Sequence, residues 1–176
     1  MRLFVAINLS DDILKYLFSL RDSLIINGNI NTVKNTHLTL KFLGETEDSK
    51  KDEIIDILNN LSFKSFKIQL DSFGLFPNEN YFRVLWVGIT PEEKVIELQK
   101  GVDNSLSSLF PIDKKFKPHI TLARIKFIIN KDEFLKQLQL IKIEQREITI
   151  DKFSLIKSTL TKSGPVYEII EEFPAS

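Results

Sequence analysis

Residues 37–40 read His-Leu-Thr-Leu and residues 119–122 read His-Ile-Thr-Leu, and these segments contain the only two histidines of the chain. Apolar and polar residues alternate in both, which predicts β-strands with one buried face. Because residues i and i+2 of a strand point to the same side, each strand should present an imidazole and a hydroxyl together. Core packing gives no reason for both histidines to have the same neighbours, so the repeat indicates a functional pair.

The elements around the two motifs recur in a similar order. A strand over residues 3–9 and a helix starting near Ser10 precede the first motif, and a strand over residues 82–89 and a third helix precede the second. The histidines lie 82 residues apart (119 minus 37), close to half of the 176-residue chain. We therefore predict an α+β protein containing a duplication, whose pseudo-twofold arrangement brings one histidine strand from each lobe to a central cleft.

Boundaries of further elements follow from local signals. The third helix is predicted to start at Thr90, with Pro91 at its first helical position and Glu93 completing a capping box. Two late strands are predicted over residues 146–156 and 166–171. Since no linker rich in proline, glycine or serine interrupts the chain, we expect residues 1–176 to form a single domain of two lobes.

Composition excludes several classes of protein. Lys and Arg together number 24, as do Asp and Glu, so no global positive field exists and any contact with nucleic acid must be local. The absence of cysteine removes disulfides, thiol nucleophiles and thiolate metal sites. The sequence has neither a recognisable secretory signal nor a membrane-spanning stretch, and we expect a cytoplasmic monomer with no contact to membranes.

The paired histidines suit displacement at phosphorus. That reaction needs a base to deprotonate the incoming water and an acid to protonate the departing oxygen, and one residue cannot hold both positions. Two imidazoles with ordinary pKa values near about 6.5 could share these roles at neutral pH without any metal or cofactor. Thr39 and Thr121 would donate hydrogen bonds to the nonbridging phosphate oxygens.

Two basic residues could neutralise a bound phosphate. Lys41 should share the face of His37, whereas Arg124 lies three residues after Thr121 and would point to the opposite face unless a bulge intervenes. The alternatives are structural: the histidines could be partly buried polar residues, the threonines ordinary strand residues, and Arg124 a surface group. A metal site has thin support, because two histidines without cysteine or His-Glu-x-x-His spacing supply few ligands.

Six segments together resemble the 2H phosphoesterases, and in particular the RNA 2′,3′-cyclic phosphodiesterases formerly labelled 2′-5′ RNA ligases. In chain order they are MRLFVAI at the start, HLTLKFLGE at 37–45, FGLFPN with FRVLWVG at 73–88, FKPHITLAR at 116–124, FSLIKSTL at 153–160 and GPVYEI at 164–169. The resemblance covers nearly the whole chain, and a series in this order is more specific than either tetrapeptide.

The resemblance implies two lobes, each an antiparallel β-sheet flanked by helices, around a water-filled cleft that uses no metal. Members of the family open a terminal 2′,3′-cyclic phosphate to a 2′-phosphomonoester. By that resemblance His37 is the general acid for the leaving 3′ oxygen and His119 is the base that activates water. Thr39, Thr121 and Arg124 match phosphate-binding positions.

Two aromatic residues are further candidates. Phe4 occupies the strand where related enzymes place an aromatic ring against the terminal base, and Tyr167 could border the cleft, although core packing explains both equally well. The residues before the first motif, NINTVKNT at 29–36, depart from the family because an aromatic residue and a proline often precede this motif. We therefore expect a differently shaped loop before His37.

Other readings stay open at this point. The same acid and base could act on ADP-ribose 1″,2″-cyclic phosphate or on 2′-5′ oligonucleotides instead of RNA 3′ ends or small cyclic nucleotides. A binding module for RNA ends without turnover would need phosphate donors but no matched acid and base, so the two complete motifs favour an enzyme.

Overall fold

A computed structural model describes all residues from 1 to 176. The chain forms nine β-strands, four α-helices and one short 3-10 helix, in agreement with the predicted α+β class. In chain order the elements are β1 (Arg2–Ile7), α1 (Asp11–Asp22), β2 (Gly28–Thr32), β3 (Leu38–Glu45), η1 (Asp48–Lys50), α2 (Lys51–Asn59), β4 (Phe66–Pro77), β5 (Phe82–Thr90), α3 (Glu93–Ser105), β6 (Ile120–Ile128), α4 (Lys131–Leu140), β7 (Glu147–Ile150), β8 (Lys152–Thr161) and β9 (Gly164–Pro174). No helix is long and apolar enough to cross a membrane.

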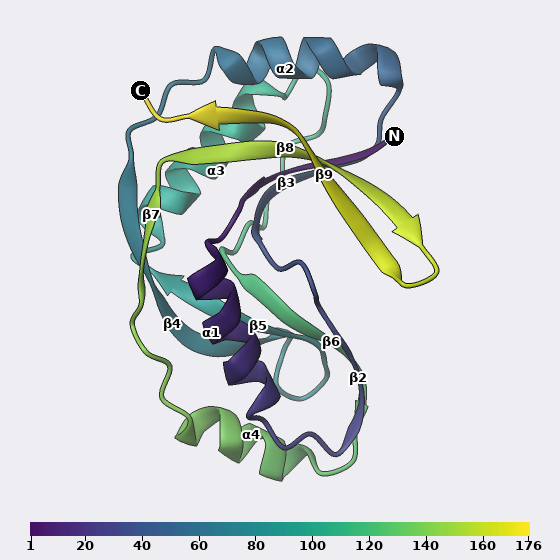
Figure 1. Cartoon of the computed structure of the whole chain (residues 1–176), viewed down its shortest axis with the longest axis vertical. Helices are drawn as coiled ribbons and strands as arrows, with labels where there is room; N and C mark the ends of the chain where they lie inside the picture. Colours follow the sequence, from purple (N-terminus) through teal and green to yellow (C-terminus); the bar gives the residue numbers. More distant parts are fainter.

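All strands belong to one antiparallel sheet of order β7-β4-β5-β6-β3-β1-β8-β9, with β2 added beside β6. The sheet is curled, with α2 and α3 near β8 and β9 at one end of the molecule and α1 and α4 beside β2 and β6 at the other (Figure 1). The two ends correspond to the two predicted lobes.

The two halves of the chain exchange elements. Strand β4 from the first half pairs with β7 from the second half, and β8 from the second half pairs with β1 from the first. The helices are also exchanged, because α1 contacts β6 and α3 contacts β3. Each lobe is therefore built from both halves, which explains why no linker separates them.

The motif strands meet at the middle of the sheet. Strands β3 and β6 form a single residue pair, Leu38 with Ile120, and these are the residues that directly follow His37 and His119. Neighbouring strands of a sheet lie about 4.8 Å apart. The predicted approach of the two motifs is therefore confirmed at the level of the backbone.

Apolar burial occurs on two sides of the sheet. The main core of 36 buried hydrophobic residues includes Leu38 and Leu40 of β3 and Ile120 and Leu122 of β6. A separate small cluster, formed by Phe4, Ala6 and Ile156 with Tyr167 packed against it, lies under the cleft face of β1 and β8. The side chains at Thr39 and Thr121 consequently face away from the main core.

Two predicted boundaries were wrong, and one strand was missed. Thr90 does not cap α3, because it belongs to β5 and pairs with Gln69; the helix begins at Glu93 without a side-chain cap. The strand predicted over residues 146–156 is divided at Asp151 into β7, which pairs with β4, and β8, which pairs with β1. Strand β2 was not predicted, since the sequence GNINT lacks apolar alternation.

Candidate active site

Both imidazoles are held by the same backbone contact. Nδ1 of His37 lies 3.1 Å from the carbonyl oxygen of Asn35, and Nδ1 of His119 lies 2.7 Å from that of Lys117, so each partner is two residues upstream. Because a carbonyl oxygen only accepts hydrogen bonds, Nδ1 must carry a proton in both rings. Each Nε2 is thereby left to accept or donate a proton.

Aromatic rings support His37 from two directions. Phe4 stacks on the imidazole with ring centres 4.8 Å apart, and Tyr167 meets it edge-on at 5.3 Å. Phe4 is only 3% exposed, so its ring packs beneath the imidazole, while its predicted contact with a base stays a prediction. Tyr167 contacts both Phe4 and His37, and so both borders the histidine and packs against the sheet.

His119 has an aromatic environment of its own. Phe76 contacts the imidazole edge-on at 4.8 Å, and Trp86 lies 6.1 Å away. Trp86 lies directly over Gly74 on the neighbouring strand, where a Cβ atom would stand 2.0 Å from the indole ring. Only glycine at position 74 leaves room for this arrangement.

Burial lowers the pKa of both histidines. It lowers the pKa of His37 to about 4, against the opposing effect of the Asn35 carbonyl, and the nearby charge of His119 lowers that pKa further. The pKa of His119 is also lowered by burial, although its contact with the Lys117 carbonyl opposes the shift. The expectation of ordinary pKa values was therefore wrong, and burial favours the neutral form of both rings.

A bulge in β6 brings Arg124 to the face of Thr121. Adjacent residues of β5 pair with Thr121 and with Ala123, which leaves Leu122 as an extra residue in β6. Leu122 and Ala123 are both fully buried, and Arg124 is exposed. The bulge thus removes the objection that strict alternation raised against Arg124.

A second bulge, in β3, turns Lys41 away from the cleft. Adjacent residues of β1 pair with Thr39 and Lys41, so Leu40 is the extra residue. Lys41 is 5% exposed on the core side, and Phe42 takes the cleft side with 72% exposure. The prediction that Lys41 shares the face of His37 was therefore wrong.

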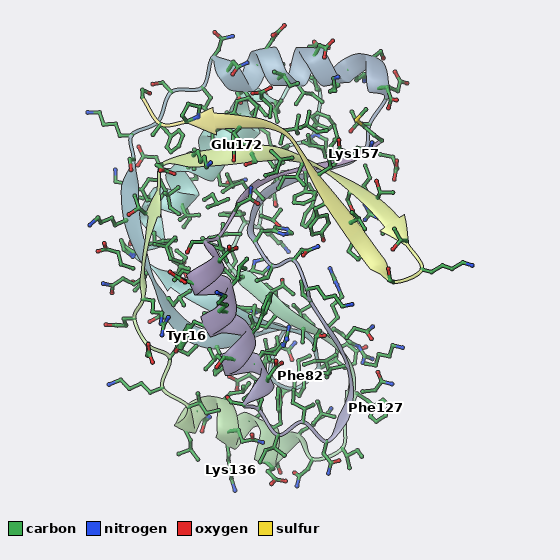
Figure 2. All side chains as sticks on the ribbon, in the orientation of Figure 1. Tyr16, Phe82, Phe127, Lys136, Lys157 and Glu172 are labelled. Atoms are coloured by element: carbon green, nitrogen blue, oxygen red, sulfur yellow. The ribbon has the colours of Figure 1, made fainter.

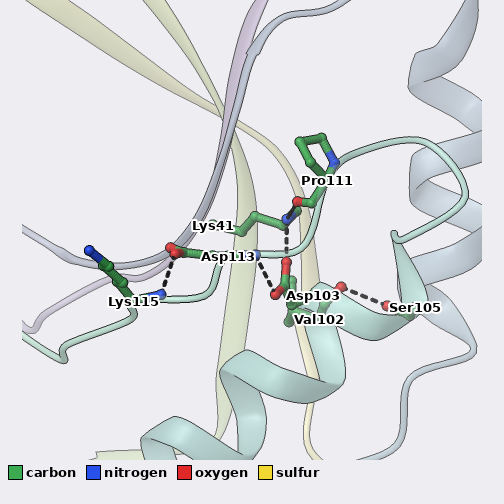
Figure 3. Close-up of polar contacts among 7 residues, drawn as sticks. All are labelled: Lys41, Val102, Asp103, Ser105, Pro111, Asp113 and Lys115. Carbon is green, nitrogen blue, oxygen red and sulfur yellow. Dashed lines mark hydrogen bonds and ion pairs between the residues drawn. The ribbon is translucent and has the colours of Figure 1, made fainter.

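Lys41 instead forms a buried ion pair with Asp103 of α3 (Figure 3). Its ammonium group also donates to the carbonyl oxygen of Pro111 at 2.8 Å, and Asp103 accepts from the backbone N–H of Asp113 at 2.8 Å. These contacts anchor the segment that leads to Lys117, whose carbonyl orients His119. Lys41 consequently connects the first motif strand to the approach of the second.

A cavity of about 380 Å³ opens beside the first motif. It brings together four of the predicted residues, Phe4, His37, Arg124 and Tyr167, from different segments of the chain. Thr39, Thr121 and His119 do not line it. A second depression of about 400 Å³ lies between α3 and the connection from α2 to β4, and contains neither histidine.

Arg2 and Phe42 are among the residues of this cavity that sequence reasoning missed. Phe42 stands three residues after Thr39, as Arg124 stands three residues after Thr121, so an alignment of HLTLKF with HITLAR would have indicated it. Arg2 lies two residues before Phe4 on the same strand face, and alternation from Phe4 would have indicated it.

Comparisons with known proteins agree with the duplicated fold. The family model described as LigT-like phosphoesterase matches the chain twice, over residues 7–86 and 87–167, in accord with the duplication. The RNA 2′,3′-cyclic phosphodiesterase of Methanocaldococcus jannaschii is 36% identical over 98% of this chain and the whole of its own length. That of Thermotoga maritima is 34% identical over 98% of this chain and 94% of its own.

Solved structures share the fold. The Thermus thermophilus protein TT0787 superposes with a TM-score of 0.83 at 28% identity, over 99% of this chain and 97% of that one. Escherichia coli LigT in complex with 3′-AMP superposes with a TM-score of 0.77 at 23% identity, over 99% of this chain and 98% of its own, which establishes a common fold.

Proposed function

The chain belongs to the LigT-like phosphoesterase family, and on that premise we propose that it hydrolyses the terminal 2′,3′-cyclic phosphate of RNA to a 2′-phosphomonoester. The names of several relatives that match over most of the chain support this activity. The observation that carries the proposal is the adjacency of the two motifs, with each imidazole fixed through Nδ1 and its Nε2 left unbonded.

In the proposed reaction, a water molecule attacks phosphorus while Nε2 of His119 accepts its proton. The bond between phosphorus and O3′ breaks, and His37 donates a proton to O3′, which leaves a 3′-hydroxyl and a 2′-phosphate. His37 ends neutral and His119 ends protonated, and exchange with solvent restores both. The assignment of acid and base follows the family resemblance.

The lowered pKa of His37 fits an acid that is charged by its substrate. In the empty cleft, burial favours the neutral ring. A bound phosphate anion favours the protonated form and raises the pKa of the imidazole beside it. The cyclic phosphate itself would therefore prepare His37 to donate a proton.

We assign the hydroxyls of Thr39 and Thr121 and the guanidinium of Arg124 to the nonbridging oxygens, where charge must be stabilised during displacement. Arg124 makes no hydrogen bond or ion pair within the chain, so its donors are available to a ligand. No group of three His, Asp or Glu residues is arranged to hold a metal ion. We propose that the protein supplies the positive charge itself, and that catalysis continues in EDTA.

The test is product identification. The protein is incubated in EDTA with an RNA oligonucleotide that ends in a 2′,3′-cyclic phosphate, and the product is identified by phosphorus NMR. We expect a 2′-phosphomonoester. A 3′-phosphate product would contradict the assigned leaving group, and activity that depends strictly on a metal would contradict the mechanism. Parallel reactions with ADP-ribose 1″,2″-cyclic phosphate and a linear 2′-5′ oligonucleotide test the neighbouring substrate classes.

Three further expectations belong to the same proposal. The pairing of β4 with β7 and of β8 with β1 across the halves supports a single domain over residues 1–176, and cooperative unfolding would test it. We also propose that the protein is a monomer located in the cytoplasm, which sedimentation and cell fractionation would test.

A further inference from the structure

The cavity beside His37 contains two arginines without partners. The chain has five arginines, and three of them are bound to carboxylate, hydroxyl or carbonyl oxygens: Arg21, Arg83 and Arg146. Arg2 and Arg124 make no side-chain hydrogen bond or ion pair, and both line this one cavity. Because an unpaired guanidinium presents a fork of donors that suits phosphate, the cavity has two places for an anion.

Arg2 and Arg124 stand at different places along the cavity. Arg2 precedes Phe4 by two residues on β1, and Phe4 stacks under His37. Two residues of a strand span about 6.6 Å, so the backbone of Arg2 lies that far from Phe4, on the same face. Arg124 is on β6, the strand of His119 and Thr121. A phosphate held between the motifs therefore leaves Arg2 free for a second group.

The side chain of Arg2 turns toward the cavity despite a carboxylate nearby. Glu45 on the adjacent strand β3 is paired with Arg2 in the sheet, yet the two side chains form no ion pair. On the other side Arg2 pairs with Ser158, which in turn pairs with Tyr167. The positive charges of Arg124 and Arg2 oppose the rise in the pKa of Tyr167 that burial causes, as expected if both guanidinium groups lie near this hydroxyl.

A lysine in the middle of the adjoining hairpin of β8 and β9 is already neutralised. Lys157, which lies on this hairpin (Figure 2), pairs with Glu168 at 3.6 Å. On the adjacent strand β1, Lys157 is paired with Leu3, which is a buried core residue. The side chain of Lys157 therefore points to the face of the sheet opposite to that of Arg2. Arg2 is thus the uncompensated cation on the cavity side of this region.

We propose that Arg2 binds the phosphate on the 5′ side of the terminal nucleotide, so that the protein prefers RNA ends to isolated cyclic nucleotides. This inference rests on the proposed function. The cyclic phosphate occupies the two motifs with Arg124, the terminal nucleoside spans the cavity, and the next phosphate of the chain reaches Arg2. Recognition at Arg2 requires only a phosphate, so it is independent of base sequence.

Three substrates separate the contribution of the 5′-phosphate from that of an added nucleoside. They are a nucleoside 2′,3′-cyclic phosphate, the same molecule with a 5′-phosphate, and a dinucleotide ending in the cyclic phosphate. We expect kcat/KM of the wild type to be about tenfold higher for the second and third substrates than for the first. In Arg2→Gln that advantage should disappear, while turnover of the first substrate is unchanged. Arg2→Lys, which keeps the charge, should retain part of it.

Lys162→Gln is the matched control, because it removes one positive charge from the hairpin tip outside the cavity. It should leave all three values of kcat/KM unchanged. For the dinucleotide, the plot of log kcat/KM against log salt concentration has a negative slope, and its magnitude should be smaller by about 0.7 in Arg2→Gln than in the wild type. A gain from the dinucleotide but not from the 5′-phosphate would place the preference in the added nucleoside and overturn the role of Arg2.

Two other outcomes would also overturn the inference: an advantage that survives Arg2→Gln, or a loss of equal size on all three substrates. Failure of the proposed function looks different, because the wild type would then hydrolyse none of the three.

Discussion

Replacement of Lys41 by methionine should destabilise the protein strongly. The ammonium and carboxylate groups of Lys41 and Asp103 are both buried, with side chains 4% and 3% exposed (Figure 3). Without the lysine, the Asp103 carboxylate keeps only the N–H of Asp113 and stays away from water. Removing one partner of such a pair costs about 3–5 kcal/mol. For a chain of this size we expect the melting temperature to fall by about 6–20 °C.

Thermal unfolding followed by circular dichroism measures this loss of stability, and two further variants serve as a control and as a rescue. Lys67→Met removes a strand lysine whose pair with Glu147 is exposed, and should cost less than about 1 kcal/mol. The double variant Lys41→Met with Asp103→Leu removes both charges and should recover most of the lost stability.

Activity of the double variant then reports on His119. The double replacement also removes the anchors of Pro111 and Asp113, upstream of the carbonyl of Lys117 that holds the imidazole. We expect kcat to remain lower than in the wild type after stability returns. If Lys41→Met lowered kcat/KM without lowering the melting temperature, Lys41 would act in the cleft and the interpretation of the β3 bulge would be wrong.

Three further predictions concern the cleft. The pH profile of kcat/KM should be bell-shaped, with its acidic limb near pH 4 and its alkaline limb below pH 6.5, because burial lowers the pKa of both histidines in the free enzyme. The profile of kcat should lie at higher pH, because the bound anion favours protonated histidines. An alkaline limb of kcat/KM above pH 7 would contradict the effect of burial. Trp86, the only tryptophan, lies 6.1 Å from His119, so its fluorescence should be quenched as His119 becomes charged below pH 6.5; a transition that persists in His119→Asn would show that another group is responsible. Arg124→Gln should lower kcat/KM on the cyclic phosphate by about 10²-fold with little change in melting temperature, and an equal rate in the variant would remove Arg124 from the site.

Strand alternation predicted the motif strands correctly, because Leu38 and Leu40 in β3, and Ile120 and Leu122 in β6, are two residues apart and face the main core. It could not reveal the bulges. Leu40 and Leu122 look like ordinary strand residues, yet each is an extra residue in its ladder. The bulges decide that Arg124 faces the cleft and that Lys41 does not. Periodicity therefore fixes which strands carry the site, while the register of pairing decides which side chains enter it.

Two other features depend on contacts between distant segments. At Asp151 the strand partner changes from β4, which pairs with β7, to β1, which pairs with β8. The sequence shows no turn signal at this point, so the one strand that was predicted is two strands in the structure. The pKa of His37 depends on burial against residues distant in sequence, including Phe4 and Tyr167. Neither the change of strand partner nor the burial of a histidine is encoded in the residues next to it.

The cooperation of the two imidazoles is tested most directly by single-turnover rates for His37→Ala, His119→Ala and the double variant on one cyclic-phosphate substrate. We predict that each single replacement lowers the rate by about 10²–10⁴-fold, and that the double variant is about as slow as the slower single one, because an acid and a base in one step fail together. Binding of a 2′-nucleotide product should persist. Losses that multiply in the double variant, or a single variant that keeps the wild-type rate, would contradict a shared catalytic step.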